Sequence, residues 1–242
     1  MSGERLAGMR ALLADDAAAR GTAVSSEAAC EACVRLTGVS GVQLTLMNGT
    51  SRGGSRYSTN EIGDQLEDLR FVLGEGPCDD AVRFGLPVLV PDLDSGENHR
   101  RWPLFTLAAG ATGARALFAF PLRSGAVRLG ALVLHRTSPG PLAPEHVSGM
   151  QVLADVVMLL LLDELASARL RTDVPPPGAV LFGHAEVHQA IGMLSVRMGV
   201  PMDEALVRLR AHALVRDQPV VQVARSVVAR RLRLSANGRS ER

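Results

Sequence analysis

Hydrophobic and polar positions alternate along several short stretches in the N-terminal part of the chain, which predicts strands joined by turns. Residues 42–46 (VQLTL) alternate strictly, as in a half-buried strand. Asn48-Gly49 follows as a turn signal, so residues 55–59 are expected to pair back as a second strand. Further strands are expected at 87–90, 114–122 and 127–136.

Helical spacing interrupts this alternation at 25–36 and 61–71. Short helices and strands with antiparallel neighbours predict an α+β fold, an antiparallel sheet domain with flanking helices. The opening stretch, residues 4–23, is rich in Ala and helix-prone but weakly patterned, so partial disorder is expected there.

A long helix is predicted at 144–170, because apolar residues recur there at spacings of three and four. Its apolar stripe is wider than one domain face needs. We therefore expect the helix to pack partly on the sheet and partly against a second copy of itself, which predicts a homodimer. The stripe consists of Val147, Met150, Leu153, Val157, Leu160, Leu161 and Leu165.

Three consecutive prolines, at 175–177, predict a stiff linker, and the pattern beyond it is purely helical. Gly199, Pro201 and Pro219 divide this part into three short amphipathic helices, which predict a small all-α bundle. The expected organisation is an N-terminal helical or flexible segment 1–24, a sheet domain 25–143, a connecting dimerisation helix 144–171, a Pro-rich linker 172–179, a three-helix module 180–234 and a flexible tail 235–242.

The distribution of charge supports a division of labour. The chain has a net charge of +1, but residues 187–242 carry ten Arg against four acidic residues, a net of +6. The N-terminal region is acidic and the C-terminal region is basic. This distribution fits an N-terminal region that senses a signal and a C-terminal region that binds a polyanion. The plainer interpretation is that Arg serves as the surface residue of these helices, since the chain contains no Lys.

Several function classes find no support in the residues. The three cysteines form no disulfide framework, Met1–Arg10 lacks the apolar core of a signal peptide, and the most apolar run, 156–162, is too short to cross a bilayer. A soluble, cytoplasmic protein without a membrane partner is expected. No catalytic set, metal-ligand set or Gly-rich phosphate cradle stands out, so we expect no enzyme activity, metal or cofactor.

Two stretches resemble known families. Gly74-Glu75-Gly76-Pro77-Cys78, Pro87-Val88-Leu89, Phe120-Pro121-Leu122 and Arg128-Leu129-Gly130-Ala131-Leu132 resemble the GAF domains of actinobacterial regulators. Val187-His188-Gln189-Ala190-Ile191-Gly192-Met193-Leu194, Asp203-Glu204-Ala205 and Val223-Ala224 resemble the ANTAR module, a three-helix unit that binds RNA in antitermination regulators. Their order matches GAF–ANTAR proteins, which implies a sensor for a small-molecule effector joined to a module that binds hairpin RNA.

The ANTAR resemblance implies an RNA-binding surface of basic residues. Guanidinium groups suit this task because they pair with phosphates bidentately and stack on bases. Ile191 departs from the ANTAR pattern, which often has Lys or another polar residue there, and so removes a possible phosphate contact. The candidate RNA-binding residues are His188, Arg197, Arg208, Arg210, Arg216 and Arg225, with Arg230, Arg231 and Arg233 beyond them.

The GAF resemblance implies a ligand pocket lined by residues of the sheet domain, although for each residue a place in the core is the more frequent role. The turn at Gly74–Pro77 is expected to set Cys78 near a helix N-terminus, where a thiol is either reactive or simply buried. The candidate ligand-binding residues are Leu44, Leu46, Tyr57, Phe71, Cys78, Phe118 and Phe120.

The leading hypothesis is a signal-responsive RNA-binding regulator, a transcription antiterminator. A DNA-binding transcriptional regulator with a helix-turn-helix in the last three helices is an alternative, although neither later helix shows a clear polar recognition face. A GAF-fold thiol-dependent sulfoxide reductase is a further alternative, because Cys30, Cys33 and Cys78 lie in the same domain.

Overall fold

The computed structural model describes residues 2–47, 55–170, 185–216, 218, 220–234 and 240–241. The predicted turn at Asn48-Gly49 and the predicted linker at 172–179 lie outside these residues.

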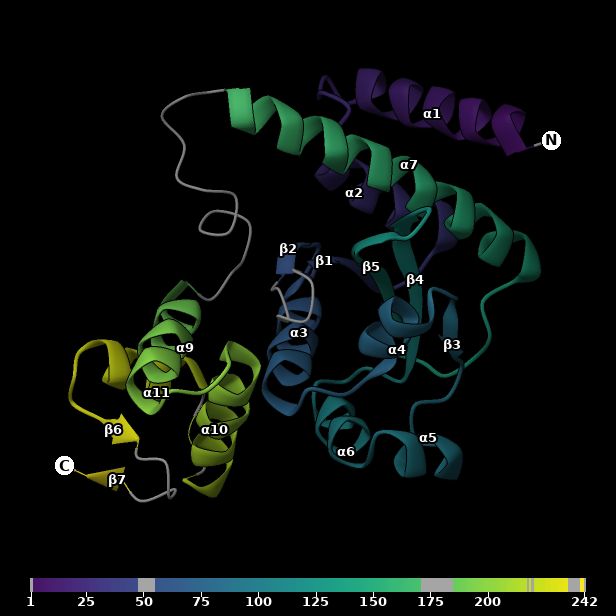
Figure 1. Ribbon diagram of the computed structural model, residues 1–242. Helices are drawn as coiled ribbons and strands as arrows, with labels where there is room; N and C mark the ends of the chain where they lie inside the picture. The colour runs from purple at the N-terminus through teal and green to yellow at the C-terminus, as the bar shows by residue number, and fades with distance from the viewer. Residues whose placement is uncertain are drawn as a thin grey trace.

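A five-stranded antiparallel sheet forms the centre of the N-terminal domain, in the order β2-β1-β5-β4-β3 (Figure 1). A Cβ atom at Gly130 would lie 1.9 Å from the Thr45 carbonyl oxygen, so the close approach of β5 to β1 requires glycine. The α+β fold predicted from the alternation is confirmed. The strands are β1 Gly41–Leu46, β2 Ser55–Ser58, β3 Val88–Val90, β4 Ala116–Ser124 and β5 Val127–Arg136.

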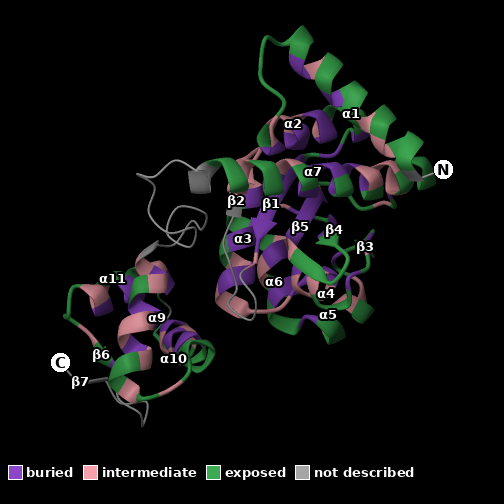
Figure 2. Cartoon of the chain, turned by 45° about the horizontal axis from the view of Figure 1, so that its top comes forward, coloured by how far each residue is buried: buried purple, intermediate pink, exposed green. Residues whose placement is uncertain are grey.

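The period of two along each strand sends neighbouring side chains to opposite faces of the sheet. On β1, Val42, Leu44 and Leu46 face α2 (Ser26–Thr37) and α7 (Pro144–Leu170), in one buried cluster. The other face packs against helices that include α3 (Glu61–Leu73), α4 (Pro77–Phe84) and α6 (Pro103–Ala111), with α5 (Gly96–Arg101) beside them. Both faces are therefore covered, and β1, β5 and β4 are largely buried (Figure 2).

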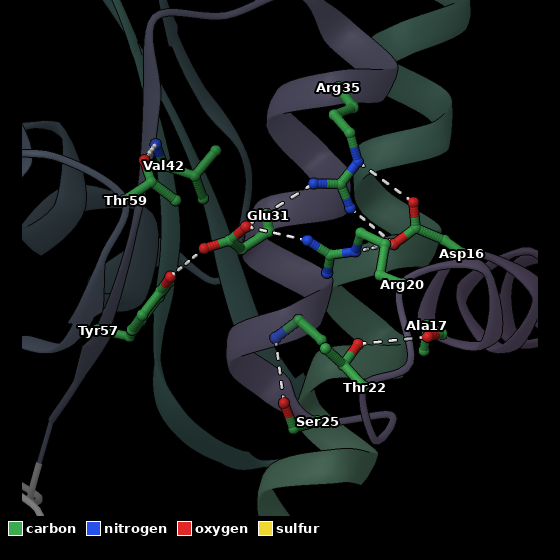
Figure 3. Close-up of polar contacts among 11 residues, drawn as sticks. Asp16, Ala17, Arg20, Thr22, Ser25, Glu31, Arg35, Val42, Tyr57 and Thr59 are labelled. Atoms are coloured by element: carbon green, nitrogen blue, oxygen red, sulfur yellow. Dashed lines mark hydrogen bonds and ion pairs between the residues drawn. The ribbon is translucent and has the colours of Figure 1, made fainter.

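The helix α1 (Ser2–Ala19) is regular, so the expected partial disorder of this segment is wrong. It lies along α7 and adds Leu13 to the buried cluster of α2 and α7 (Figure 1). Asp16 accepts hydrogen bonds from Arg35 of α2 at 2.6 and 3.2 Å, and Arg20 binds Glu31 at 3.1 Å (Figure 3). These ion pairs stabilise a helix whose weak apolar pattern alone did not predict an ordered packing partner.

The position of α1 also changes the interpretation of α7. Its wide apolar stripe is largely used within one chain, because Leu153, Val157 and Leu161 are buried against the sheet domain and α1 packs beside them. Among the residues of this helix whose exposure the structure describes, only Leu159 and Leu162 are exposed large apolar residues. The width of the stripe therefore does not by itself require a second copy.

The C-terminal part contains α9 (Ala185–Met198), α10 (Met202–Val215) and α11 (Val220–Val228), which pack into a bundle with a core of its own. Gly199, at φ 65°, forms the turn that the sequence predicted between the first two helices. Within the tail expected from residue 235, Ser240–Glu241 is instead a short strand, β7, paired with β6 (Arg233–Leu234). No helix in the described ranges is long and apolar enough to span a membrane.

Candidate nucleic-acid interface

The bundle core explains the departure at Ile191. Its side chain is buried with Val187, Leu194 and Leu209 between the helices, and does not point to solvent. An apolar residue there stabilises the bundle, because each buried aliphatic side chain contributes roughly 1.5–3 kcal/mol. Polar contacts of the module must therefore come from other positions.

A cavity of about 300 Å³ opens on the bundle between α9, α11 and the segment that follows α11. Its floor is apolar and comes from Met193, Leu194, Val227 and Leu232. Its remaining lining residues are all arginines: Arg197, Arg230 and Arg233. Sequence reasoning grouped these arginines only as a basic set, because the cavity depends on how the chain turns after α11.

That turn is held by backbone hydrogen bonds. The Arg230 N–H donates to the Val227 carbonyl at 2.9 Å, and the N–H groups of Arg231 and Leu232 donate to the Ser226 carbonyl at 2.8 and 3.0 Å. Arg230 adopts φ 57°, a left-handed conformation that usually falls to glycine at a helix end. A non-glycine residue there costs about 1–3 kcal/mol, and such strain is frequent at functional sites.

The three arginines of the cavity are exposed, and their side chains form no ion pair or hydrogen bond with any residue that the structure describes. Three cationic groups around one opening repel one another, and no ion pair among the described side chains compensates them. An anion is the natural complement of such a group.

The other candidate RNA-binding residues are distributed around the bundle. Arg208 pairs with Glu204 on α10, and Arg225 of α11 pairs with Glu186 of α9 at 3.2 Å. Of the six candidates, only Arg197 lies at the cavity. His188 is half-buried on α9, Arg216 is exposed after α10, and Arg210 faces the sheet domain.

Arg210 takes part in a contact between the two domains. Its guanidinium lies 5.3 Å from the centroid of the Phe71 ring, which belongs to α3. Phe71 is only 1% exposed and is buried in the same cluster as Leu206 and Leu209 of α10, with Val72 partly buried against it. The prediction that Phe71 lines a ligand pocket of the sheet domain is therefore wrong, because its ring packs against the bundle.

The space between β1 and α3 holds a buried polar cluster. Glu67 accepts from Gln43 at 2.6 Å and from Thr45 at 3.0 Å. Arg70 donates to both Glu67 oxygens at 2.6 and 2.9 Å, and to Asp79 at 3.3 Å. The side chains of Glu67 and Arg70 are 1–2% exposed, so their charges are matched inside the domain.

The seven candidate ligand-binding residues do not surround one cavity. Leu44, Leu46, Phe118 and Phe120 belong to the core on the α2 and α7 face, and Cys78 belongs to the core on the opposite face. Tyr57 is half-buried and donates its hydroxyl proton to Glu31 at 2.6 Å (Figure 3), which lowers the pKa of that carboxyl. These four residues of the α2 and α7 face are core residues, which is the alternative role expected from the sequence for each candidate.

The Gly74–Cys78 motif has a structural role in this chain. Gly74, at φ 74°, ends α3, and Pro77 begins α4. Between them Glu75 accepts the backbone N–H groups of Leu104 at 2.8 Å and of Phe105 at 2.9 Å, and so caps α6. The motif therefore joins three helices. The sequence predicted α3 and a helix N-terminus near Cys78, where α4 begins, but it did not predict α6.

Cys78 lies apart from the other two cysteines. Cys30 and Cys33 are buried on the α2 face and Cys78 on the α4 face, so the sheet separates them. Burial raises the pKa of the Cys33 thiol to about 12 and also raises the pKa values of Cys30 and Cys78. Cys30 and Cys33 are neighbours on α2, but both thiols are buried and their pKa values are raised, so they lack the accessible thiolate that the reductase hypothesis requires. The described residues also contain no group of ligands suited to a metal ion.

Comparison with known proteins agrees with this architecture. The family model of the GAF domain matches residues 25–161, and that of the ANTAR domain matches residues 180–228. The chain therefore belongs to the GAF domain family. It carries an ANTAR domain behind the GAF domain and is, in this order, a GAF–ANTAR protein, a signal-responsive regulator of the ANTAR type.

Solved structures are similar to part of this chain at low sequence identity. A domain of a putative two-component sensor histidine kinase from Sinorhizobium meliloti 1021 is 17% identical, with 60% of this chain and 94% of that chain covered and a TM-score of 0.49. The GAF domain of a phosphoenolpyruvate-protein phosphotransferase from Acinetobacter is 13% identical, with 70% and 98% covered and a TM-score of 0.48. Among curated proteins, none matches this chain.

Proposed function

We propose that this protein is a transcription antiterminator whose ANTAR bundle binds hairpin RNA in the cytoplasm, under the control of an effector sensed by the GAF domain. The observation that carries this proposal is the group formed by Arg197, Arg230 and Arg233, which surround one cavity without a compensating charge in the described chain. Phosphate groups of RNA supply that charge, and release of their counterions favours binding.

The α3–α10 contact is the proposed route between sensor and output. On α3, Glu67 and Arg70 belong to the buried polar cluster of the GAF domain, and the next residue, Phe71, packs against the bundle. A change in the GAF interior that shifts α3 would therefore alter the environment of Arg210. We propose that RNA binding to the bundle and docking of the bundle on α3 oppose each other. An effector then acts by shifting the populations of the docked state and the RNA-bound state.

A homodimer remains part of the proposal, since two linked bundles would bind two hairpins with a higher effective concentration than one. Leu159 and Leu162, the exposed apolar residues of α7, are the surface available for it. Sedimentation of the wild-type protein and of Leu159→Glu/Leu162→Glu tests this; a monomer in both cases contradicts the dimer and leaves RNA binding unaffected.

Titration of the protein against a leader RNA with two hairpins, by gel shift at two salt concentrations, tests RNA binding directly. Duplex DNA of the same length serves as the competitor. We expect RNA binding that weakens with salt and that DNA does not displace. Preferential binding of DNA would favour a DNA-binding regulator, and the absence of salt-sensitive binding to RNA would contradict the proposal.

A further inference from the structure

The cavity of the ANTAR bundle has the size of a site for a single small group. At about 300 Å³ it lies at the lower end of the range of about 300–1,000 Å³ that small-molecule sites occupy. A stacked duplex cannot place a base in such a space, because its bases lie inside the helix. One unstacked residue of a nucleic acid chain can enter it.

The chemistry of the lining is divided between the floor and the rim. Leu194 and Val227 are buried in the bundle, and Met193 and Leu232 are half-buried beside them. Methionine and leucine side chains adapt to a flat apolar surface, such as the face of a base. The arginines of the rim suit the phosphates on either side of that base, and a guanidinium also stacks on it.

The rim is positioned before any ligand binds. The three backbone hydrogen bonds at the end of α11 fix the left-handed Arg230, and the chain then places Leu232 and Arg233 at the cavity. A backbone that is already ordered at this turn avoids the cost of ordering the segment at the moment of binding. A preformed cavity with a charged rim therefore favours a specific occupant over diffuse attraction.

We propose that this cavity takes one unpaired nucleotide from the loop of the hairpin, with its base on the apolar floor and its flanking phosphates on Arg197, Arg230 and Arg233. This inference rests on the proposed function, since it assigns the RNA loop to a place on the bundle. It goes beyond that function because it separates recognition of one base from attraction to the phosphate backbone.

The first test uses the wild-type protein and a hairpin enriched from a library with randomised loops. Each loop nucleotide is replaced in turn by an abasic residue. Since stacking of a base contributes about 1–3 kcal/mol, we expect one position to weaken binding by about 10-fold or more, and the others to have smaller effects. Equal effects at all positions would overturn the single-nucleotide site.

A second test fills the cavity. Met193→Trp is expected to weaken binding of the intact hairpin by about 10-fold and to remove the penalty of the abasic position. Val196→Trp is the matched control, because Val196 lies on the same helix, is 87% exposed and does not line the cavity. Thermal unfolding of both variants identifies a loss of fold. Wild-type binding by Met193→Trp in a folded bundle would overturn the inference.

A third arm distinguishes a loop nucleotide from a free one. Nucleoside monophosphates are titrated into the full chain with ¹³C-labelled methionine methyl groups, and the Met193 signal is followed. A Met193 signal that shifts with both the hairpin and the monophosphate supports the inference.

If no hairpin is enriched from the library, the proposed function fails. A Met193 shift that saturates with a monophosphate alone would then show a site for a free nucleotide. A Met193 signal that responds to neither ligand would overturn the cavity as a nucleotide site.

Discussion

Arginines in the two domains of this protein have opposite surroundings. In the GAF domain, Arg70 is 1% exposed and its guanidinium is bound by Glu67 and Asp79. In the ANTAR bundle, Arg197, Arg230 and Arg233 are exposed around a cavity and lack such partners among the described residues. The same side chain therefore stabilises a fold where its charge is matched, and is available to a ligand where it is not.

The largest effect is expected from Arg70→Met. It leaves Glu67 as a buried carboxylate without its cation, and breaking a buried ion pair in this way costs about 3–5 kcal/mol. Urea denaturation measures the loss. The double variant Glu67→Gln/Arg70→Met removes both charges and is expected to recover part of that stability. A loss below 1 kcal/mol for the single variant would show that the cluster is not what stabilises the GAF interior.

A smaller effect is expected from acid. His135 is buried on β5, neither ring nitrogen has a hydrogen-bond partner within the described structure, and burial lowers its pKa to about 4 from 6.5. The unfolded chain therefore binds more protons between these values. Stability is complete above about pH 6.5 and is lost as the pH falls towards 4, by roughly 3 kcal/mol in all.

Denaturation midpoints of the wild type and of His135→Asn between pH 7.5 and 4.5 test this dependence. The variant is expected to lose most of the slope in that range. His212 of α10 also has a lowered pKa, from burial and from Arg216, but it is less buried and contributes less. An unchanged slope in His135→Asn would assign the dependence to other groups.

The ANTAR bundle has two different faces: one packs against α3 of the GAF domain, and the other carries the cavity with its arginines. Phe71→Ala removes the ring that covers Arg210, and we expect RNA affinity to rise by several-fold because the docked arrangement loses its centre. Fluorescence titration with a labelled hairpin measures it. Phe84→Ala is the matched control, since Phe84 belongs to the same domain and is 55% exposed. An unchanged affinity in a folded Phe71→Ala protein would separate α3 from the output.

The sequence predicted those elements of the fold in which hydrophobic residues recur at a regular spacing. Alternation located β1 and β5, and spacings of three and four located α7 and the bundle. It predicted only the N-terminus of α4, near Cys78, and it did not predict α5 and α6, which are short helices where local pattern is weak. It described residues 1–24 only as a helical or flexible segment, because the ion pair that joins α1 to α2 is a tertiary contact that no local pattern contains.

The candidate sites were harder to predict for a related reason. A list of apolar residues does not show which face of the sheet each one occupies, so Leu44 and Cys78 were grouped although they lie in separate cores. A list of arginines does not show which are paired. The Glu204–Arg208 pair has the i, i+4 spacing that a helix brings together, whereas Glu186 reaches Arg225 only because α9 packs on α11.

The salt dependence of RNA affinity tests the difference between paired and unpaired arginines most directly. Affinity for one hairpin is measured between 50 and 300 mM salt for the wild type, for Arg197→Ala/Arg230→Ala/Arg233→Ala, and for the control Arg208→Ala/Arg225→Ala. Since each phosphate contact contributes about 0.7–0.9 to the slope of log K against log salt, we expect the triple variant to lose about 2–3 from the slope and the control to keep it. Equal losses in both variants, or none in the triple variant, would contradict RNA binding through this cavity.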